Sequence, residues 1–141
     1  MKIDRPFFDT DVLLYLLSED NRKADRAEAI VASGGIISVQ VLNEFASVAS
    51  RKLGMSYAEI RDMLGTVRAV CQTQALTVDT HERGLDIVER FGFSLYDSMI
   101  VSSALQSGCD ILYSEDMRHG QEIDGQLMVM NPFLDNLRDN Q

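Results

Sequence analysis

Four acidic residues stand where apolar stretches of this chain give way to helical patterns. They are Asp9 in PFFDTDVLLYLL, Glu44 in IISVQVLNEF, Asp97 in FSLYDSMIVSSAL and Asp116 in CDILYSEDM. If the strands of one parallel sheet carry them, they meet at the crevice beyond the carboxyl ends, where open α/β sheets bind ligands. Four like charges gathered there would repel one another and raise their pKa values unless a cation neutralised them. The sequence therefore predicts a divalent metal site.

Such a site is suited to the hydrolysis of phosphodiesters. The reaction needs an activated water and positive charge near the phosphoryl oxygens, and one or two Mg²⁺ or Mn²⁺ ions supply both. Carboxylates and retained waters are the ligands that these hard cations prefer, so all four acids are predicted to hold the metal directly or through water. The hydroxyls of Ser114 and Thr10 are placed to orient a ligand or the attacking water. Asn43 is a weaker candidate, because adjacent helical residues point about 100° apart. Metal-assisted hydrolysis needs no imidazole, so His119 is predicted to be a solvent-facing loop residue.

Each acid also has a purely structural interpretation. Asp9 or Asp11 would cap the first helix, and Glu44 would be a solvated helix residue. Asp97 would complete a capping box that begins at Ser94, and Asp116 would be an ordinary loop residue. The order and context of the four together favour the catalytic interpretation.

Strands alternate with helices along the chain, which predicts a three-layer α/β sandwich with a mostly parallel sheet of about five strands. Strands are predicted at residues 6–10, 36–38, 75–78, 111–113 and 127–130. One helix follows the first strand, and others are predicted at 21–33, 39–53, 56–71, 80–91 and 96–106, several of them ending at glycine. Residues 114–120 are predicted to be a polar loop, and Asn131-Pro132 to begin a short terminal helix.

Length and composition predict one globular domain over residues 1–141. No stretch approaches the roughly 20 apolar residues of a membrane span, and Asp9 and Asp11 interrupt the start before a signal-peptide core can form. We therefore expect a cytoplasmic protein without a membrane partner. Cys71 and Cys109 lie in apolar stretches without the spacing of a zinc or redox motif, so buried, reduced thiols are expected.

The net charge of −9 restricts the partners of the protein. An acidic surface does not bind nucleic acid promiscuously, so a polyanionic substrate has to be admitted by a local basic patch. Ten of the thirteen basic residues are Arg, which grips phosphate bidentately. Candidates for such a patch are Arg5, Arg51, Arg61, Arg68 and Arg118, each with a solvated surface position as the alternative.

The four acidic motifs together resemble those of PIN-domain ribonucleases over nearly the whole chain. The matching segments are Asp9-Thr10, Asn43-Glu44, Tyr96-Asp97 and Ser114-Glu115-Asp116. Within that family the chain most resembles the VapC-type toxins of bacterial toxin–antitoxin pairs, down to the segment Asn131-Pro132-Phe133. The resemblance implies a Mg²⁺- or Mn²⁺-dependent endoribonuclease that acts on RNA. It also implies a homodimer, held inactive by an antitoxin whose C-terminal segment lies across the acidic site.

Two positions depart from the pattern of that family. Asp11 stands where Asn, Ser or Thr is more frequent, and Glu115 lies beside Asp116. Either of these two adjacent acids is a candidate for the metal.

Two alternatives to the nuclease remain. Asp9-Thr10-Asp11-Val12 resembles the D-x-D-x-V/T signature of haloacid-dehalogenase-type phosphatases, in which the first Asp is the nucleophile and the second the general acid/base. Glu115-Asp116 would then bind Mg²⁺ and Lys52 would neutralise the phosphate, but Glu44 and Asp97 would have no role. The other alternative is a non-catalytic PIN-like binding module, which the presence of all four acids disfavours.

Overall fold

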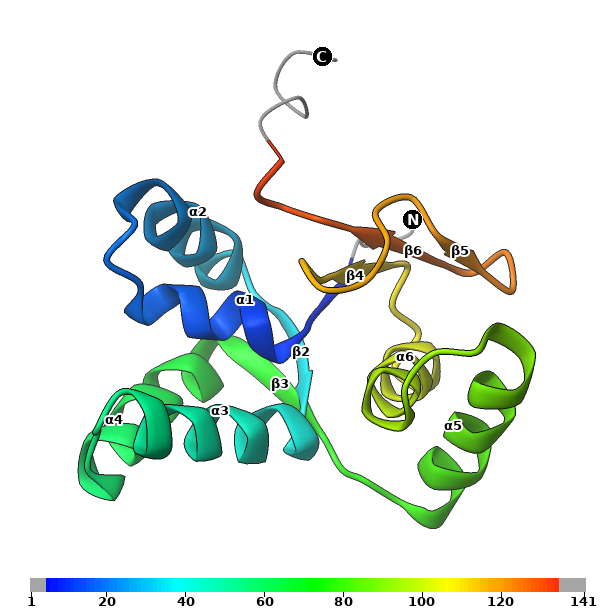
Figure 1. Ribbon diagram of the computed structural model, residues 1–141, viewed down its shortest axis with the longest axis horizontal. Helices are drawn as coiled ribbons and strands as arrows, with labels where there is room; N and C mark the ends of the chain where they lie inside the picture. The colour runs from blue at the N-terminus through cyan, green and yellow to red at the C-terminus, as the bar shows by residue number, and fades with distance from the viewer. Residues whose placement is uncertain (1–4, 135–141) are drawn as a thin grey trace.

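The computed structural model describes residues 5–134, in which a six-stranded sheet has helices on both faces (Figure 1). Strand order is β3-β2-β1-β4-β6-β5, with all pairs parallel except β5 with β6. The strands are β1 Pro6–Phe8, β2 Gly35–Ser38, β3 Cys71–Gln74, β4 Ile111–Tyr113, β5 Glu122–Ile123 and β6 Leu127–Met130. The predicted fold class is thus confirmed, with one strand more than expected.

Six α-helices connect these strands. They are α1 Thr10–Leu14, continued by a 3-10 turn at Tyr15–Leu17, α2 Asn21–Ala32, α3 Val39–Lys52, α4 Tyr57–Val70, α5 Val78–Phe91 and α6 Leu95–Gln106. Figure 1 shows α1 and α2 on one side of the sheet and α5 and α6 on the other. Among residues 5–134, no helix has the length and apolar character needed to cross a membrane.

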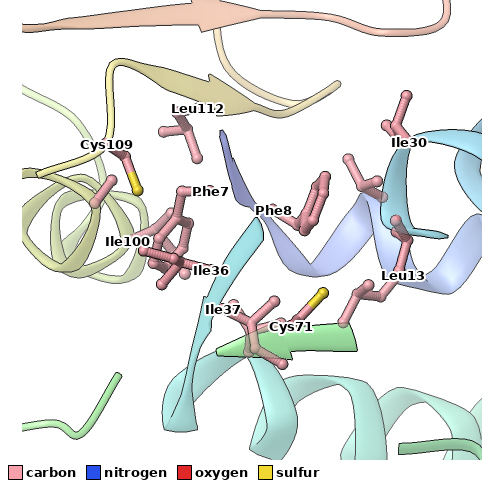
Figure 2. Close-up of a cluster of buried hydrophobic side chains, with 14 of the residues drawn as sticks. Phe7, Phe8, Leu13, Ile30, Ile36, Ile37, Cys71, Ile100, Cys109 and Leu112 are labelled. Atoms are coloured by element: carbon pink, nitrogen blue, oxygen red, sulfur yellow. The ribbon is translucent and has the colours of Figure 1, made fainter. Parts of the chain in front are cut away.

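The central strands are apolar on both faces because helices cover both. In β1, the adjacent residues Phe7 and Phe8 are fully buried and point to opposite faces, as successive residues of a strand do. Figure 2 shows Phe7 beside Ile100 of α6 and Phe8 toward Leu13 of α1. Cys71 and Cys109 are free and buried, and burial raises the pKa of each thiol to about 11. The expectation of buried, reduced thiols is met.

The strand predicted at residues 75–78 is wrong. The third strand is β3, whose residues pair in parallel register with β2 from Gly35 opposite Cys71 to Ser38 opposite Gln74. Thr77 instead caps α5 by accepting a hydrogen bond from the amide of Thr80 at 3.1 Å. The capping box fixes the start of α5 and overrides the strand propensity of Leu-Thr-Val.

The short strand β5 was not predicted, because two residues carry no detectable alternation. The turn between β5 and β6 does have a sequence signal, the dipeptide Asp124-Gly125. Asp124 and Gly125 both adopt positive φ, 56° and 64°, as the residues of tight hairpin turns do. The terminal helix predicted from Asn131-Pro132 falls mostly outside the described residues. Just before residue 134, where the description ends, Asn131 Oδ1 accepts a hydrogen bond from the Phe133 amide at 2.9 Å.

Candidate active site

A cavity of about 360 Å³ lies beyond the carboxyl ends of β1 and β4. Residues from α1, α3, α6 and the β4–β5 loop line it, since the parallel strands deliver the elements that follow them to one edge of the sheet. Among residues 5–134, its acidic lining consists of Asp9, Asp11, Glu44, Asp97 and Asp116, and its basic lining residue is Arg51. The structure thus brings together all four predicted carboxylates and adds a fifth.

Asp9 lies deepest among these acids, with 5% of its surface exposed. One carboxylate oxygen caps α1 by accepting from the amide of Thr10 at 2.7 Å, and the other accepts the hydroxyl of Ser114 at 2.8 Å. Ser114 is fully buried, and its Oγ also accepts the amide of Met117 at 3.3 Å. The predicted orienting role of this serine is therefore consistent with its contacts. The capping interpretation of Asp9 is confirmed, and the same carboxylate lines the cavity.

Glu44 is fixed between two neighbouring helices. Its Oε1 accepts the hydroxyl of Thr10 at 2.6 Å, and its Oε2 accepts the side-chain amide of Gln40 at 3.3 Å. The same Gln40 amide donates to the carbonyl of Tyr96 at 3.1 Å, which ties α3 to the start of α6. Gln40 was not predicted as a site residue, although it lies four residues before Glu44 on the same face of the helix.

Asp97 lies in the first turn of α6, and Asp116 is on the β4–β5 loop. The Asp97 amide donates to Ser94 Oγ at 3.1 Å, so Ser94 caps the helix as predicted. Burial raises the pKa of Asp97, and repulsion from Asp116 and Glu44 adds to this effect against the hydrogen bond from Ser94. These three acids therefore interact electrostatically at the cavity.

The structure separates the two adjacent acids of the β4–β5 loop. The Glu115 carboxylate accepts the ammonium of Lys23 at 2.7 Å and the hydroxyl of Tyr15. The Lys23 ammonium lies 4.5 Å from the centre of the Tyr15 ring and 5.6 Å from that of Phe133. Asp116 lines the acidic cavity, so it and not Glu115 is the better metal candidate.

Asp11 has a role in the site that the sequence did not reveal. Its Oδ2 accepts the backbone amides of Glu115 and Asp116, both at 3.0 Å. Its Oδ1 is buried and has no hydrogen-bond partner among the residues that the structure describes. In the sequence, Asp11 departs from the family pattern and is the acid/base of the phosphatase alternative.

The two innermost acids hold protons unusually tightly. Burial raises the pKa of Asp9 from 3.8 to about 7, against the hydrogen bonds from Ser114 and Thr10 and with added repulsion from Asp97 and Asp116. Burial and repulsion from Asp9 and Asp116 raise the pKa of Asp11 from 3.8 to about 8, despite its two backbone hydrogen bonds. At neutral pH and without metal, these two carboxyls therefore keep protons that an ordinary Asp has lost.

The donor set of the cavity fits a hard divalent cation. Among the described residues, no three His, Cys, Asp or Glu side chains lie close enough together to hold a metal ion by themselves. Mg²⁺ does not need three such ligands, because it keeps several waters and binds through one or two carboxylates. The mutual repulsion of Asp9, Asp97 and Asp116 is what a bound divalent cation would offset.

The remaining candidates lie elsewhere. Arg61 and Arg68 line a different surface cavity along α4, and Arg5 donates to Gln72 at 2.6 Å, so the arginines do not form one patch. His119 is exposed, as predicted, and its Nδ1 accepts the amide of Asn131 at 2.9 Å. Lys52 is exposed at the end of α3 and is absent from the cavity lining.

A larger cavity of about 700 Å³ adjoins the acidic one. It lies between α3 and the N-terminal ends of α5 and α6, and it shares Glu44, Ser47 and Arg51 with the acidic cavity. Asn43 lines this cavity and not the acidic one, which agrees with its low rank as a metal ligand. Leu76, Leu95, Tyr96 and Met99 make its wall largely apolar.

The comparisons with known proteins agree on one fold. The family model of the PIN domain matches residues 7–121. A toxin–antitoxin complex from Klebsiella pneumoniae is similar with a TM-score of 0.68 and 20% identity, covering 90% of this chain and 97% of that chain. VapC20 of Mycobacterium tuberculosis, a toxin that cleaves the sarcin–ricin loop, has a TM-score of 0.65 and 19% identity over 79% of this chain and 89% of its own.

A third similar structure is VapBC2 from Rickettsia felis bound to a DNA fragment from its promoter. It has a TM-score of 0.65 and 15% identity, covering 89% of this chain and 97% of that chain. Among curated proteins, none matches the sequence. At these identities the solved structures establish the fold, and the family model establishes the family.

Proposed function

This chain belongs to the PIN-domain family, and on that basis we propose that it is an endoribonuclease that depends on Mg²⁺ or Mn²⁺. The observation that carries the proposal is the gathering of four predicted carboxylates from distant parts of the chain around one cavity. A structural role for each acid separately would not require them to face the same space. A cavity lined mainly by carboxylates is instead what a divalent cation needs, and a cation held there would in turn bind a phosphodiester.

Asp9, Glu44, Asp97 and Asp116 would hold the cation, directly or through water. A divalent ion bound there supplies an activated water and offsets charge on the phosphoryl oxygens. The chain prepares for this with hydrogen bonds that fix the acids: Ser114 orients Asp9, and Thr10 orients Glu44. Arg51, which also lines the cavity, would contact a phosphate of the substrate.

We also propose that the protein is the toxin of a toxin–antitoxin pair. The support is its likeness in fold to a toxin–antitoxin complex from Klebsiella pneumoniae and to the toxin VapC20, each over most of both chains. An acidic cavity in a chain of net charge −9 would attract a basic segment of the antitoxin. Such a pair would act in the cytoplasm, where its RNA substrate is found.

A homodimer is part of the same proposal. Exposed apolar residues lie at the N-terminal ends of α5 and α6, where Val78 is 79% and Tyr96 is 66% exposed, and Leu76, Leu95 and Tyr96 line the same cavity. Apolar surface of this kind commonly marks a protein interface. Residues 1–141 would form one domain of each protomer.

The phosphatase alternative has less support. Its acid/base would be Asp11, but one oxygen of that carboxylate accepts two backbone amides, and Lys52 is not at the cavity. The non-catalytic alternative does not account for the gathered acids.

The direct experiment is cleavage of mixed cellular RNA with Mg²⁺, with Mn²⁺ and with EDTA. We expect metal-dependent cleavage by the wild type and loss of at least about tenfold in Asp116→Asn. Asp62→Asn, on the exposed face of α4, is the matched control and should cleave normally. Hydrolysis of a generic aryl phosphate without RNA cleavage would favour the phosphatase, and metal binding without either activity would favour the binding module.

A further inference from the structure

We propose that Asp11 is a positioning residue that holds the loop of Asp116 in place for metal binding. This inference rests on the proposed function of the acidic cavity. The observation behind it is that one oxygen of Asp11 accepts the backbone amides of Glu115 and Asp116, both at 3.0 Å. These bonds join the first turn of α1 to a loop more than 100 residues away in sequence.

The loop depends on this contact because, within residues 5–134, the Asp116 side chain has no hydrogen bond or ion pair that would fix it. Ser114 is held by two hydrogen bonds: its backbone amide donates to the Met130 carbonyl at 3.0 Å, and its hydroxyl donates to Asp9. The side chain of Glu115 is held by Lys23. Asp116 itself is exposed, and its backbone amide donates to Asp11. The direction in which the Asp116 carboxylate points therefore depends on Asp11.

The contact also explains how two adjacent acids come to face different ways. With both amides drawn to Asp11, the backbone at Glu115 and Asp116 is fixed, while Lys23 and Tyr15 hold the Glu115 side chain on the far side. Asp116 is then the acid left to line the cavity. Loss of the contact would free both amides and let the loop change its orientation.

Acceptor geometry, and not the negative charge, is what this role requires. Asn keeps a carbonyl oxygen able to accept both amides, whereas Ala removes the acceptor. If Asp11 acted as a metal ligand instead, Asn and Ala would be similarly harmful. The pair Asp11→Asn and Asp11→Ala therefore separates positioning from ligation.

Glu59→Ala provides the matched control. Glu59 is also a carboxylate that accepts a backbone amide near a helix start, that of Ser56 at 2.8 Å, but it lies in α4 and not in the cavity lining. Its loss should lower stability without affecting the acidic loop.

The experiment measures, for all three variants, hydrogen exchange at the amides of Glu115 and Asp116, apparent Mn²⁺ affinity and RNA cleavage. We expect Asp11→Ala to expose both amides and to lose about 10- to 100-fold in metal affinity and kcat. Asp11→Asn should keep both amides protected and retain Mn²⁺ affinity and RNA cleavage within about threefold. Glu59→Ala should leave amide protection, Mn²⁺ affinity and cleavage unchanged.

Two results would overturn the proposal. One is protection of both amides in Asp11→Ala, and the other is a loss of Mn²⁺ affinity in Asp11→Asn as large as in a ligand variant such as Asp9→Asn. If Asp11→Ala does not fold, the Mn²⁺ affinity of Asp11→Asn alone decides between positioning and ligation. If the wild type binds Mn²⁺ but cleaves no RNA, the proposed function fails while exchange and affinity still test Asp11.

Discussion

Asp9 shows how one residue serves both the fold and the proposed chemistry. Each of its carboxylate oxygens accepts one hydrogen bond, from the amide of Thr10 and from the hydroxyl of Ser114. An ionised carboxylate has about four lone-pair sites, so two directions remain for a cation. Capping α1 thus presents the acid to the cavity in a fixed orientation.

The raised pKa values predict how metal-free stability changes with pH. Asp9 and Asp11 bind protons more tightly when folded, with pKa values of about 7 and about 8 against 3.8 for an ordinary Asp. The folded state therefore holds more protons than the unfolded state between about pH 4 and pH 8, and this contribution to stability is lost as pH rises through that window. In EDTA, the melting temperature of the wild type should fall more steeply across it than that of Asp9→Asn.

Metal should reverse this loss. A cation that binds only the folded state stabilises it, and ionised acids bind it best, so Mg²⁺ should raise the melting temperature more at pH 8 than at pH 6. Equal shifts at both values, or a wild-type curve parallel to that of Asp9→Asn, would count against the assigned electrostatics.

Asp97→Asn separates the structural from the functional interpretation of that acid. The change removes a charge that faces Asp116 and Glu44, so the metal-free melting temperature should hold or rise slightly. RNA cleavage should fall by at least about tenfold. Ser56→Ala is the control: it removes the cap of α4, which does not line the cavity, should cost about 1 kcal/mol of unfolding free energy and should leave cleavage intact. Wild-type turnover in folded Asp97→Asn would refute the four-carboxylate mechanism.

At the scale of helices and strands, the start of α1 couples to α3 through Thr10 and Glu44. Thr10→Val keeps the shape of the side chain but removes the hydroxyl that binds Glu44 at 2.6 Å. We expect a loss of about 1 kcal/mol in unfolding free energy and a weaker metal-induced rise in melting temperature. Thr66→Val, which removes a hydroxyl bonded to the Asp62 carbonyl in α4, should show only the first effect. Equal metal responses in the two variants would show that Glu44 does not depend on this contact.

The sequence predicted the elements whose signals are local. Periodicity and caps placed α2 to α6 within a few residues, because Ser56 and Ser94 accept amides of their own helices. Strand β3 was not predicted because its mostly polar sequence, Cys71–Gln74, becomes a strand by pairing with β2, a partner far away in sequence. The contacts of Asp11 were not predicted for the same reason, because the two amides that donate to it lie on a distant part of the chain. The acids were found because the strands that precede them were recognisable.

At the scale of the whole molecule, the charge of −9 limits how RNA can bind. Without divalent metal, binding to bulk RNA at physiological salt should be weaker than micromolar, because an acidic surface gains nothing from counterion release. A synthetic Arg-rich peptide should bind more tightly and block cleavage, and Asp116→Asn should weaken that binding. A peptide of the same length with Gln in place of Arg is the control. Micromolar binding of random RNA in EDTA would contradict this expectation.

The contacts of Phe133 determine how far the chain can be shortened. Its ring lies under the Lys23 ammonium, and its carbonyl accepts the Arg22 guanidinium at 3.2 Å, while Arg26 donates to the Pro132 carbonyl at 3.0 Å. A protein ending at residue 131 would lose all three contacts and would loosen Lys23, which holds Glu115 beside Asp116. Trimming this end of the chain for expression or crystallisation would thus reach the acidic loop through α2, although the segment itself does not line the cavity.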